Sequence, residues 1–153
     1  MMIQVSDGIV TLQLNGKPYQ GTYYFRCNKL VATTDGMNEA GLVANLLWLV
    51  ESEYPEYDSS KPGLTIAAWA QYVLDNFATV EEAVRALEAE PFTLFSDNVP
   101  GEERLATLHL SLSDASGDSA IVEYIDGKQV IHHSRVYQVM TNSPTLPIRG
   151  LPS

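Results

Sequence analysis

The alternation of hydrophobic and polar residues divides this chain into strands, then helices, then strands. Apolar and polar residues alternate from Val10 to Leu14, and again without a break from 106 to 113, as in strands with one buried face. Between them, apolar side chains recur at helical spacing from 64 to 77 and from 80 to 87. This order predicts an α+β fold in which helices pack on an antiparallel sheet.

Turn signals separate the strands predicted before the helices. Asn15-Gly16 predicts a two-residue hairpin, followed by a return strand over 19–25. A short strand is expected at 30–34 and a turn at 37–41. The run 42–50 has one polar side chain among nine residues, which predicts a strand buried on both faces. A buried helix is the competing interpretation of that run.

The two predicted helices follow an acidic, proline-containing loop at 51–63. The first helix should span 64–77, and its aromatic residues Trp69 and Tyr72 should belong to the core rather than to a cofactor site. Thr79 and Glu82 have the spacing of a capping box, so the second helix should begin there and end before Pro91. Since only Ala78 joins them, the helices should be neighbours in one layer.

A β-meander is expected to fill the second half of the chain. Asp114 to Gly117 and the pair Asp126-Gly127 mark its turns. The segments expected, in order, are a short strand at 92–95, a polar loop at 96–104, and strands at 106–113, 119–124, 129–132 and 136–141. The last strand should deliver Asn142 at its end, before an irregular tail at 146–153. Ser143 precedes a proline and should therefore be extended.

The length and net charge of the chain limit the classes of partner that it is expected to bind. At 153 residues the chain fits one domain, 1–153. The 19 acidic against 9 basic residues give a formal net charge of −10, which argues against nucleic acid and against an anionic membrane as partners. No apolar run is long enough to span a membrane. No export signal is visible, which leaves the cytoplasm as the default location.

Few side chains form a recognisable catalytic pattern by spacing alone. The adjacent His132 and His133 should face opposite sides of a strand, so we expect no metal site from them or from His109. No phosphate-binding glycine loop, nucleotide-binding fingerprint or serine elbow is present, and no cofactor is expected. Cys27 is the single cysteine, so no intrachain disulfide can form, and an incidental thiol is preferred over a nucleophile. Asp114 and Asp118 are expected to be solvated turn residues.

Three motifs in order carry a specific resemblance. The segment 32–46, with Asp35-Gly36-Met37-Asn38-Glu39-Ala40-Gly41-Leu42 inside it, resembles a motif of the choloylglycine hydrolase and penicillin V acylase family. Residues 110–120, with Asp114-Ala115-Ser116-Gly117, resemble a hairpin of that family, and 139–145, with Thr141-Asn142-Ser143-Pro144-Thr145, resembles a third segment. The resemblance covers about residues 30 to 145, leaving 1–29 divergent and 146–153 irregular.

The resemblance implies an N-terminal-nucleophile hydrolase that cleaves linear amide C–N bonds. The implied fold is part of an αββα sandwich, with antiparallel sheets and a two-helix layer. Implied substrates are small-molecule amides, such as conjugated bile salts, penicillin V and acyl-amides. By the match, Asn142 is an oxyanion-hole residue, and Trp48 lies near that hole and the substrate pocket.

The family's catalytic cysteine and the arginine beyond its third motif have no counterpart in this sequence. Met1 and Met2 offer no nucleophilic side chain. We therefore expect a truncated or divergent hydrolase that does not turn over penicillin V by itself. The alternative is a non-catalytic homologue that acts as a binding or interaction protein. We also expect a homodimer whose interface includes 42–50 or 106–113, because missing strands would leave sheet edges and an apolar face uncovered.

Overall fold

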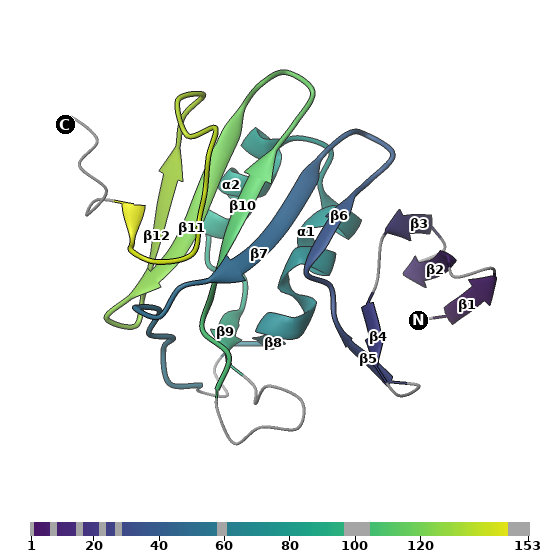
Figure 1. Ribbon diagram of the computed structural model, residues 1–153, viewed down its shortest axis with the longest axis horizontal. Coiled ribbons are helices and arrows are strands. Elements are labelled where there is room, and N and C mark those ends of the chain that lie inside the picture. Colours follow the sequence, from purple (N-terminus) through teal and green to yellow (C-terminus); the bar gives the residue numbers. More distant parts are fainter. Residues whose placement is uncertain are drawn as a thin grey trace.

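The computed structural model describes the backbone of residues 2–6, 9–14, 17–21, 24–26, 29–57, 61–96 and 105–146, and side chains within these ranges from Thr33 onward. Figure 1 shows the arrangement of its strands and helices. The strands are β1 Met2–Ser6, β2 Ile9–Leu14, β3 Lys17–Gly21, β4 Tyr24–Arg26, β5 Lys29–Ala32, β6 Asp35–Met37, β7 Val43–Trp48, β8 Gly63–Thr65, β9 Thr93–Phe95, β10 Leu108–Ser113, β11 Ser119–Ile125 and β12 Lys128–His133. The helices are the short η1 Ile66–Ala68, α1 Trp69–Asn76 and α2 Val80–Glu88.

A five-stranded antiparallel sheet is the centre of the described structure. Its strand order is β12-β11-β10-β7-β6, so the predicted meander occupies one side and β7 joins it by pairing with β10. The register places Leu110 of β10 opposite both Leu46 of β7 and Val122 of β11. Asp126 and Gly127, at φ 50° and 72°, form the tight turn between β11 and β12 that the sequence predicts.

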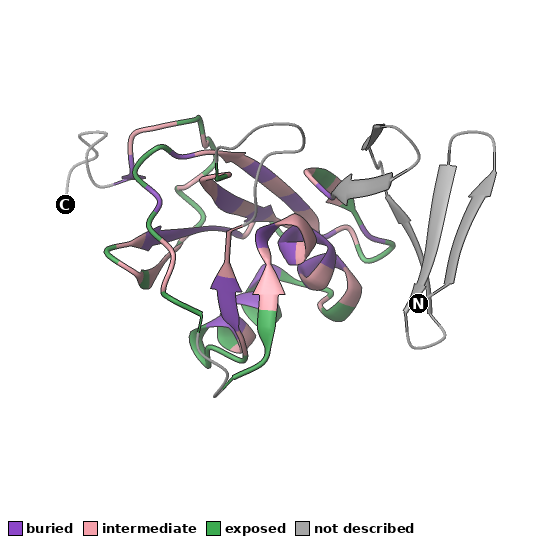
Figure 2. Cartoon of the chain, turned by 90° about the horizontal axis from the view of Figure 1, so that it is seen from below, coloured by how far each residue is buried: buried purple, intermediate pink, exposed green. Residues whose placement is uncertain are grey.

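Helices α1 and α2 both cover one face of this sheet, which confirms the α+β class and the two-helix layer (Figure 1). Buried apolar residues fill the space between helices and sheet (Figure 2). Trp69 is completely buried there, with its ring against Tyr124 at a centroid distance of 5.8 Å, as expected of a core residue. Thr79 caps α2 by accepting a hydrogen bond from the Glu82 amide, which confirms the predicted capping box.

The predicted run 42–50 is a strand, but only one of its faces is fully buried. Ala44 and Leu46 are buried beneath the helices, whereas Val43, Asn45 and Leu47 point to the other face and are half-buried. The helix layer covers one side of the sheet, so this apolar run is less enclosed than the sequence predicts. The first predicted helix also begins later than expected, because 63–65 pairs in parallel with β9 before η1 and α1 follow.

The strand predicted at 136–141 is absent. The chain turns at Ser134, whose carbonyl accepts a hydrogen bond from the Tyr137 amide, and β12 stays the outer strand of the sheet. Val136 and Val139 are 75% and 73% exposed, so their alternation does not correspond to a buried face. Asn142 therefore lies in an irregular segment rather than at a strand end.

The segments before β6 differ from the prediction in two respects, the first being β1, which pairs with β2 and is not expected from the sequence. The predicted turn at Asn15-Gly16 lies outside the described residues, although β2 and β3 on either side of it pair as antiparallel strands. The predicted return strand 19–25 is instead two strands, because β3 pairs with β2 and β4 pairs with β5. The predicted loop 96–104 and the tail 146–153 fall largely outside the described residues.

Candidate functional site

The segment that carries Asn142 lies against the end of the strand that carries Trp48. The Ser143 amide donates to the Trp48 carbonyl at 3.1 Å, and the Ser143 hydroxyl accepts from the Val50 amide at 2.8 Å. These two hydrogen bonds join residues that are 95 and 93 positions apart in the chain. The two residues singled out in the sequence therefore come from segments that are in direct contact.

Asn142 is exposed and Trp48 is half-buried. The Thr141 hydroxyl donates to the Asn142 carbonyl at 3.0 Å, and the Ser143–Pro144 peptide that follows is cis. An exposed carboxamide can donate through its NH₂ group to an acceptor outside the chain. The indole of Trp48, on the adjoining segment, offers a flat apolar surface to the acyl part of a ligand.

Beneath this segment lies a buried cluster of ionisable side chains that the sequence analysis did not foresee. Glu123 of β11 and His109 of β10 are 1% and 0% exposed, and Glu123 Oε1 lies 3.1 Å from His109 Nδ1. His132 Nε2 of β12 lies 3.4 Å from Glu123 Oε2, too poorly aligned to count as a hydrogen bond. All three occupy the face of the sheet opposite the helices.

This cluster contacts both ends of the segment 141–146. His109 Nε2 lies 3.1 Å from the Thr141 carbonyl oxygen, and the Leu146 amide donates to both Glu123 oxygens at 3.3 Å. Burial raises the pKa of Glu123, but hydrogen bonds from His109 and Leu146 and the charges of the two histidines outweigh it, so the pKa is lowered. The group is therefore a carboxylate at neutral pH.

A signal for this cluster was present in the sequence. Glu123 interrupts the otherwise apolar run from Ala120 to Ile125, and a carboxylate inside a buried strand needs partners. His109 lies on the neighbouring strand β10, and His132 of β12 pairs with Ile121, two residues before Glu123 on the same face of the sheet. The second adjacent histidine, His133, does face the other way and pairs with Asp118 at 2.8 Å, so Asp118 is not simply solvated.

Asn38, in the first family-like motif, is a buried structural residue. Its Nδ2 donates to the Leu74 and Phe77 carbonyls at 2.9 and 2.7 Å, and its Oδ1 accepts from the Ala40 and Leu42 amides at 3.1 Å each. One side chain thus closes the β6–β7 turn and caps the C-terminus of α1. The motif here serves the fold rather than a ligand.

Asp114, in the second motif, has a comparable role. Its carboxylate accepts from the Val80 amide at 2.9 Å, at the start of α2, and from the amide and hydroxyl of Ser116. Burial raises its pKa, but these hydrogen bonds outweigh that effect and lower the pKa below its usual value. The sequence interpretation of a solvated turn residue missed this contact with the helix.

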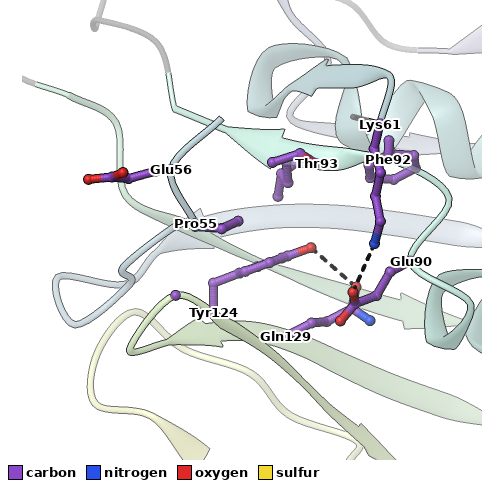
Figure 3. Close-up of a pocket in the computed structure, with 10 residues that line it drawn as sticks. Pro55, Glu56, Lys61, Glu90, Phe92, Thr93, Tyr124 and Gln129 are labelled. Carbon is purple, nitrogen blue, oxygen red and sulfur yellow. Dashed lines mark hydrogen bonds and ion pairs between the residues drawn. The ribbon is translucent and has the colours of Figure 1, made fainter. Parts of the chain in front are cut away.

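A separate cavity of about 180 Å³ opens between the segment before α1 and the β11–β12 turn. Figure 3 shows Tyr124 and Gln129 on one side of it, with the Lys61–Glu90 ion pair across the opening. The Tyr124 hydroxyl donates to Gln129 at 3.3 Å, and burial followed by the charge of Glu90 raises the pKa of Tyr124. Neither Trp48 nor Asn142 lines this cavity.

The remaining candidates add no further site. Cys27 lies outside the described residues. Within the part of the chain that the structure describes, no group of three His, Cys, Asp or Glu side chains is arranged to hold a metal ion. None of the described helices has the length and hydropathy needed to cross a bilayer.

Comparison with known proteins places this arrangement in a family. The family model of linear amide C-N hydrolases, choloylglycine hydrolase family, matches residues 21–149. A penicillin V acylase of Pectobacterium atrosepticum is 70% identical over 118 residues, covering 76% of this chain and 31% of the relative. A bile salt hydrolase/transferase of Clostridium perfringens is 36% identical over 115 residues, covering 72% of this chain and 33% of the relative.

Solved structures agree with this assignment. A penicillin V acylase from Agrobacterium tumefaciens superposes with a TM-score of 0.71 at 64% identity, covering 92% of this chain and 38% of that one. A conjugated bile acid hydrolase from Clostridium perfringens gives a TM-score of 0.70 at 27% identity, covering 97% of this chain and 49% of that one. The chain spans about a third of the length of the curated relatives it matches. With a family model matching 129 of its 153 residues, this chain belongs to the choloylglycine hydrolase family of linear amide C-N hydrolases.

Proposed function

We propose that the protein cleaves linear amide bonds and that this chain supplies the oxyanion donor Asn142 and part of the acyl pocket, at Trp48. The observation that carries this proposal is the pair of hydrogen bonds from Ser143 to Trp48 and Val50, which hold the two candidate residues on adjoining segments. A carboxamide that donates to a developing oxyanion stabilises the transition state more than the ground state.

The preferred substrate in this proposal is an amide of the penicillin V type. Sequence identity is 70% and 64% to two penicillin V acylases, against 36% and 27% to the two bile salt enzymes. The half-buried indole of Trp48 suits an aromatic acyl group, which it can contact face to edge or face to face. The alternative of a non-catalytic binding protein is not favoured, because the matched relatives are named for hydrolysis or acylase activity.

Penicillin V binding to this chain tests the proposal through its two tryptophans. Trp69 is completely buried and Trp48 is half-buried, so a bound ligand should change the emission of Trp48. We expect saturable quenching by penicillin V, weaker quenching by glycocholate, and loss of the response in Trp48→Phe. Asn142→Ala should bind penicillin V within about threefold of the unsubstituted chain, since its donor acts on the transition state.

Release of 6-aminopenicillanic acid is measured in the same samples. Any turnover above the buffer background should disappear in Asn142→Ala and persist in Asn76→Ala, a matched change at an exposed asparagine of α1. Absence of saturable penicillin V binding, or turnover that survives Asn142→Ala, contradicts the proposal.

The proposal also covers the second sheet of the sandwich and the self-association of the chain. We propose that a second sheet of the αββα sandwich packs on the face that carries His109 and Glu123, and that self-association uses this face where it is open. Edge pairing is not open to 42–50 or 106–113, because β7 and β10 are both internal strands of the sheet, so an interface that includes either strand would use its face. Light scattering at micromolar concentration tests the homodimer: a clean 16.9 kDa monomer contradicts it.

A further inference from the structure

The geometry points to His109 and Glu123 as positioning residues that fix Asn142 in place. This inference rests on the proposed role of Asn142, but its evidence is the set of contacts around the segment 141–146. Thr141 is bonded to His109, Ser143 to the end of β7, and Leu146 to Glu123. Asn142 therefore stands between two anchored neighbours, one residue away on each side.

The protons of the pair support this role. The Thr141 carbonyl can only accept, so His109 Nε2 must carry a hydrogen for that contact to be a hydrogen bond. The Nδ1 contact is a hydrogen bond only if Nδ1 also carries a hydrogen, because Glu123 is a carboxylate and can only accept. With a hydrogen on Nε2 alone, the lone pair of Nδ1 would face the Glu123 carboxylate, which is repulsive.

The pair is also rigidly held within the sheet. His109 lies opposite Leu47 in the β10–β7 register, one residue before Trp48, so it reaches the segment from the strand beside the candidate pocket. His132 closes the other side of Glu123, and its ring packs edge-on against Tyr137 at a centroid distance of 5.9 Å. Buried, fully packed strands provide the fixed base that a precisely placed donor requires.

Amide exchange and ¹⁵N spectra of this chain test the inference without any turnover. We expect His109→Ala to shift the backbone and carboxamide signals of Asn142, and Glu123→Ala to speed exchange of the Leu146 amide by about tenfold or more, since a charge-assisted hydrogen bond is lost. Glu123→Gln keeps one acceptor oxygen and should give an intermediate effect. Core amides of β10 and β11 should change much less.

Gln129→Ala is the matched control. Gln129 also bridges the sheet to another element, donating to the Leu87 carbonyl of α2 at 2.9 Å, but it lies on the opposite face and does not touch the segment. It should leave the Asn142 signals in place. Unchanged Asn142 and Leu146 signals in the His109 and Glu123 variants overturn the inference, as does an even loss of protection throughout the sheet.

A penicillin V binding assay distinguishes failure of this inference from failure of the proposed function on which it rests. If the chain binds penicillin V, the His109 and Glu123 variants should keep that affinity within about threefold while Asn142 moves, because a positioning defect in an oxyanion donor acts on the transition state. A tenfold or larger loss of affinity would instead make the pair part of the binding surface and overturn the positioning role. If the unsubstituted chain does not bind penicillin V at all, the proposed function fails, whereas local displacement of Asn142 in the variants still establishes the positioning contact.

Discussion

Replacing Asn38 by alanine should be among the most damaging single changes in the described part of the chain. The side chain is 8% exposed and makes four hydrogen bonds to the backbone, two as donor and two as acceptor. Each such bond contributes about 1 kcal/mol net, and an orphaned buried donor costs about 1–3 kcal/mol. The Leu42 amide is orphaned in this way, because Leu42 is fully buried.

These contributions together predict a loss of about 3–5 kcal/mol for Asn38→Ala. That loss is a large part of the ~5–15 kcal/mol that stabilises a typical domain. Urea unfolding followed by circular dichroism measures it as a lower midpoint at an unchanged slope. Asn76→Ala, which removes one exposed side-chain bond to the Tyr72 carbonyl, should stay within about 0.5 kcal/mol of the unsubstituted chain.

Asn38→Asp distinguishes the two hydrogen bonds that Asn38 donates from the two that it accepts. The substitution keeps the acceptor but places a carboxylate against the Leu74 and Phe77 carbonyls, which are 2.9 and 2.7 Å from the present donor. Repulsion raises the pKa of the new carboxyl, so its cost should be largest at neutral pH and shrink as pH falls from 7 to 5. A cost below about 1 kcal/mol for Asn38→Ala would refute the account of this asparagine.

Three further outcomes follow from the contacts described. Gly36→Ala should cost about 1–3 kcal/mol in thermal unfolding, because its added Cβ would lie 2.7 Å from the Cδ1 atom of Leu74. Thr79→Ala should cost about 1 kcal/mol by the same measurement, since the cap of α2 is lost. Because the pKa values of Glu123 and Asp114 are lowered in the folded state, both carboxylates stabilise the fold fully above pH 4.5 and progressively less as the pH falls through their folded-state pKa values. In an acid titration of the free energy of unfolding, Glu123→Gln should remove the part of the pH dependence that comes from Glu123.

Local patterns predicted most of the elements because they depend on neighbours in sequence. Three local features of the sequence indicate a backbone conformation that the structure also has: the alternation from 106 to 113, the Asp126-Gly127 turn and the Thr79 cap. The pairing of β7 with β10 could not be predicted in this way, since it joins residues 60 to 70 positions apart and nothing local specifies it.

The error at 136–141 shows where pattern reasoning fails. Apolar residues there resemble a strand, yet no neighbour in the described sheet offers a ladder beyond β12, and the valines remain exposed. The sequence predicted roles for Asn142 and Trp48 through family-like motifs, and the structure shows that their segments are in contact. It did not predict His109 and Glu123 as a pair: Glu123 stands out in an apolar strand, but its partner becomes evident only when two strands are placed side by side.

The two faces of the sheet are stabilised by different interactions, and the difference bears on Asn142. The helix face packs apolar side chains, and hydrophobic contact is non-directional, so it fixes the layer without fixing individual groups to a fraction of an ångström. The opposite face holds the segment 141–146 through hydrogen bonds to His109, Glu123 and the end of β7. Hydrogen bonds weaken steeply with angle and distance, so several of them around one short segment restrict it to a narrow range of positions. A donor that must meet a developing oxyanion needs that restriction, and an exposed residue in an irregular segment can obtain it from the sheet beneath.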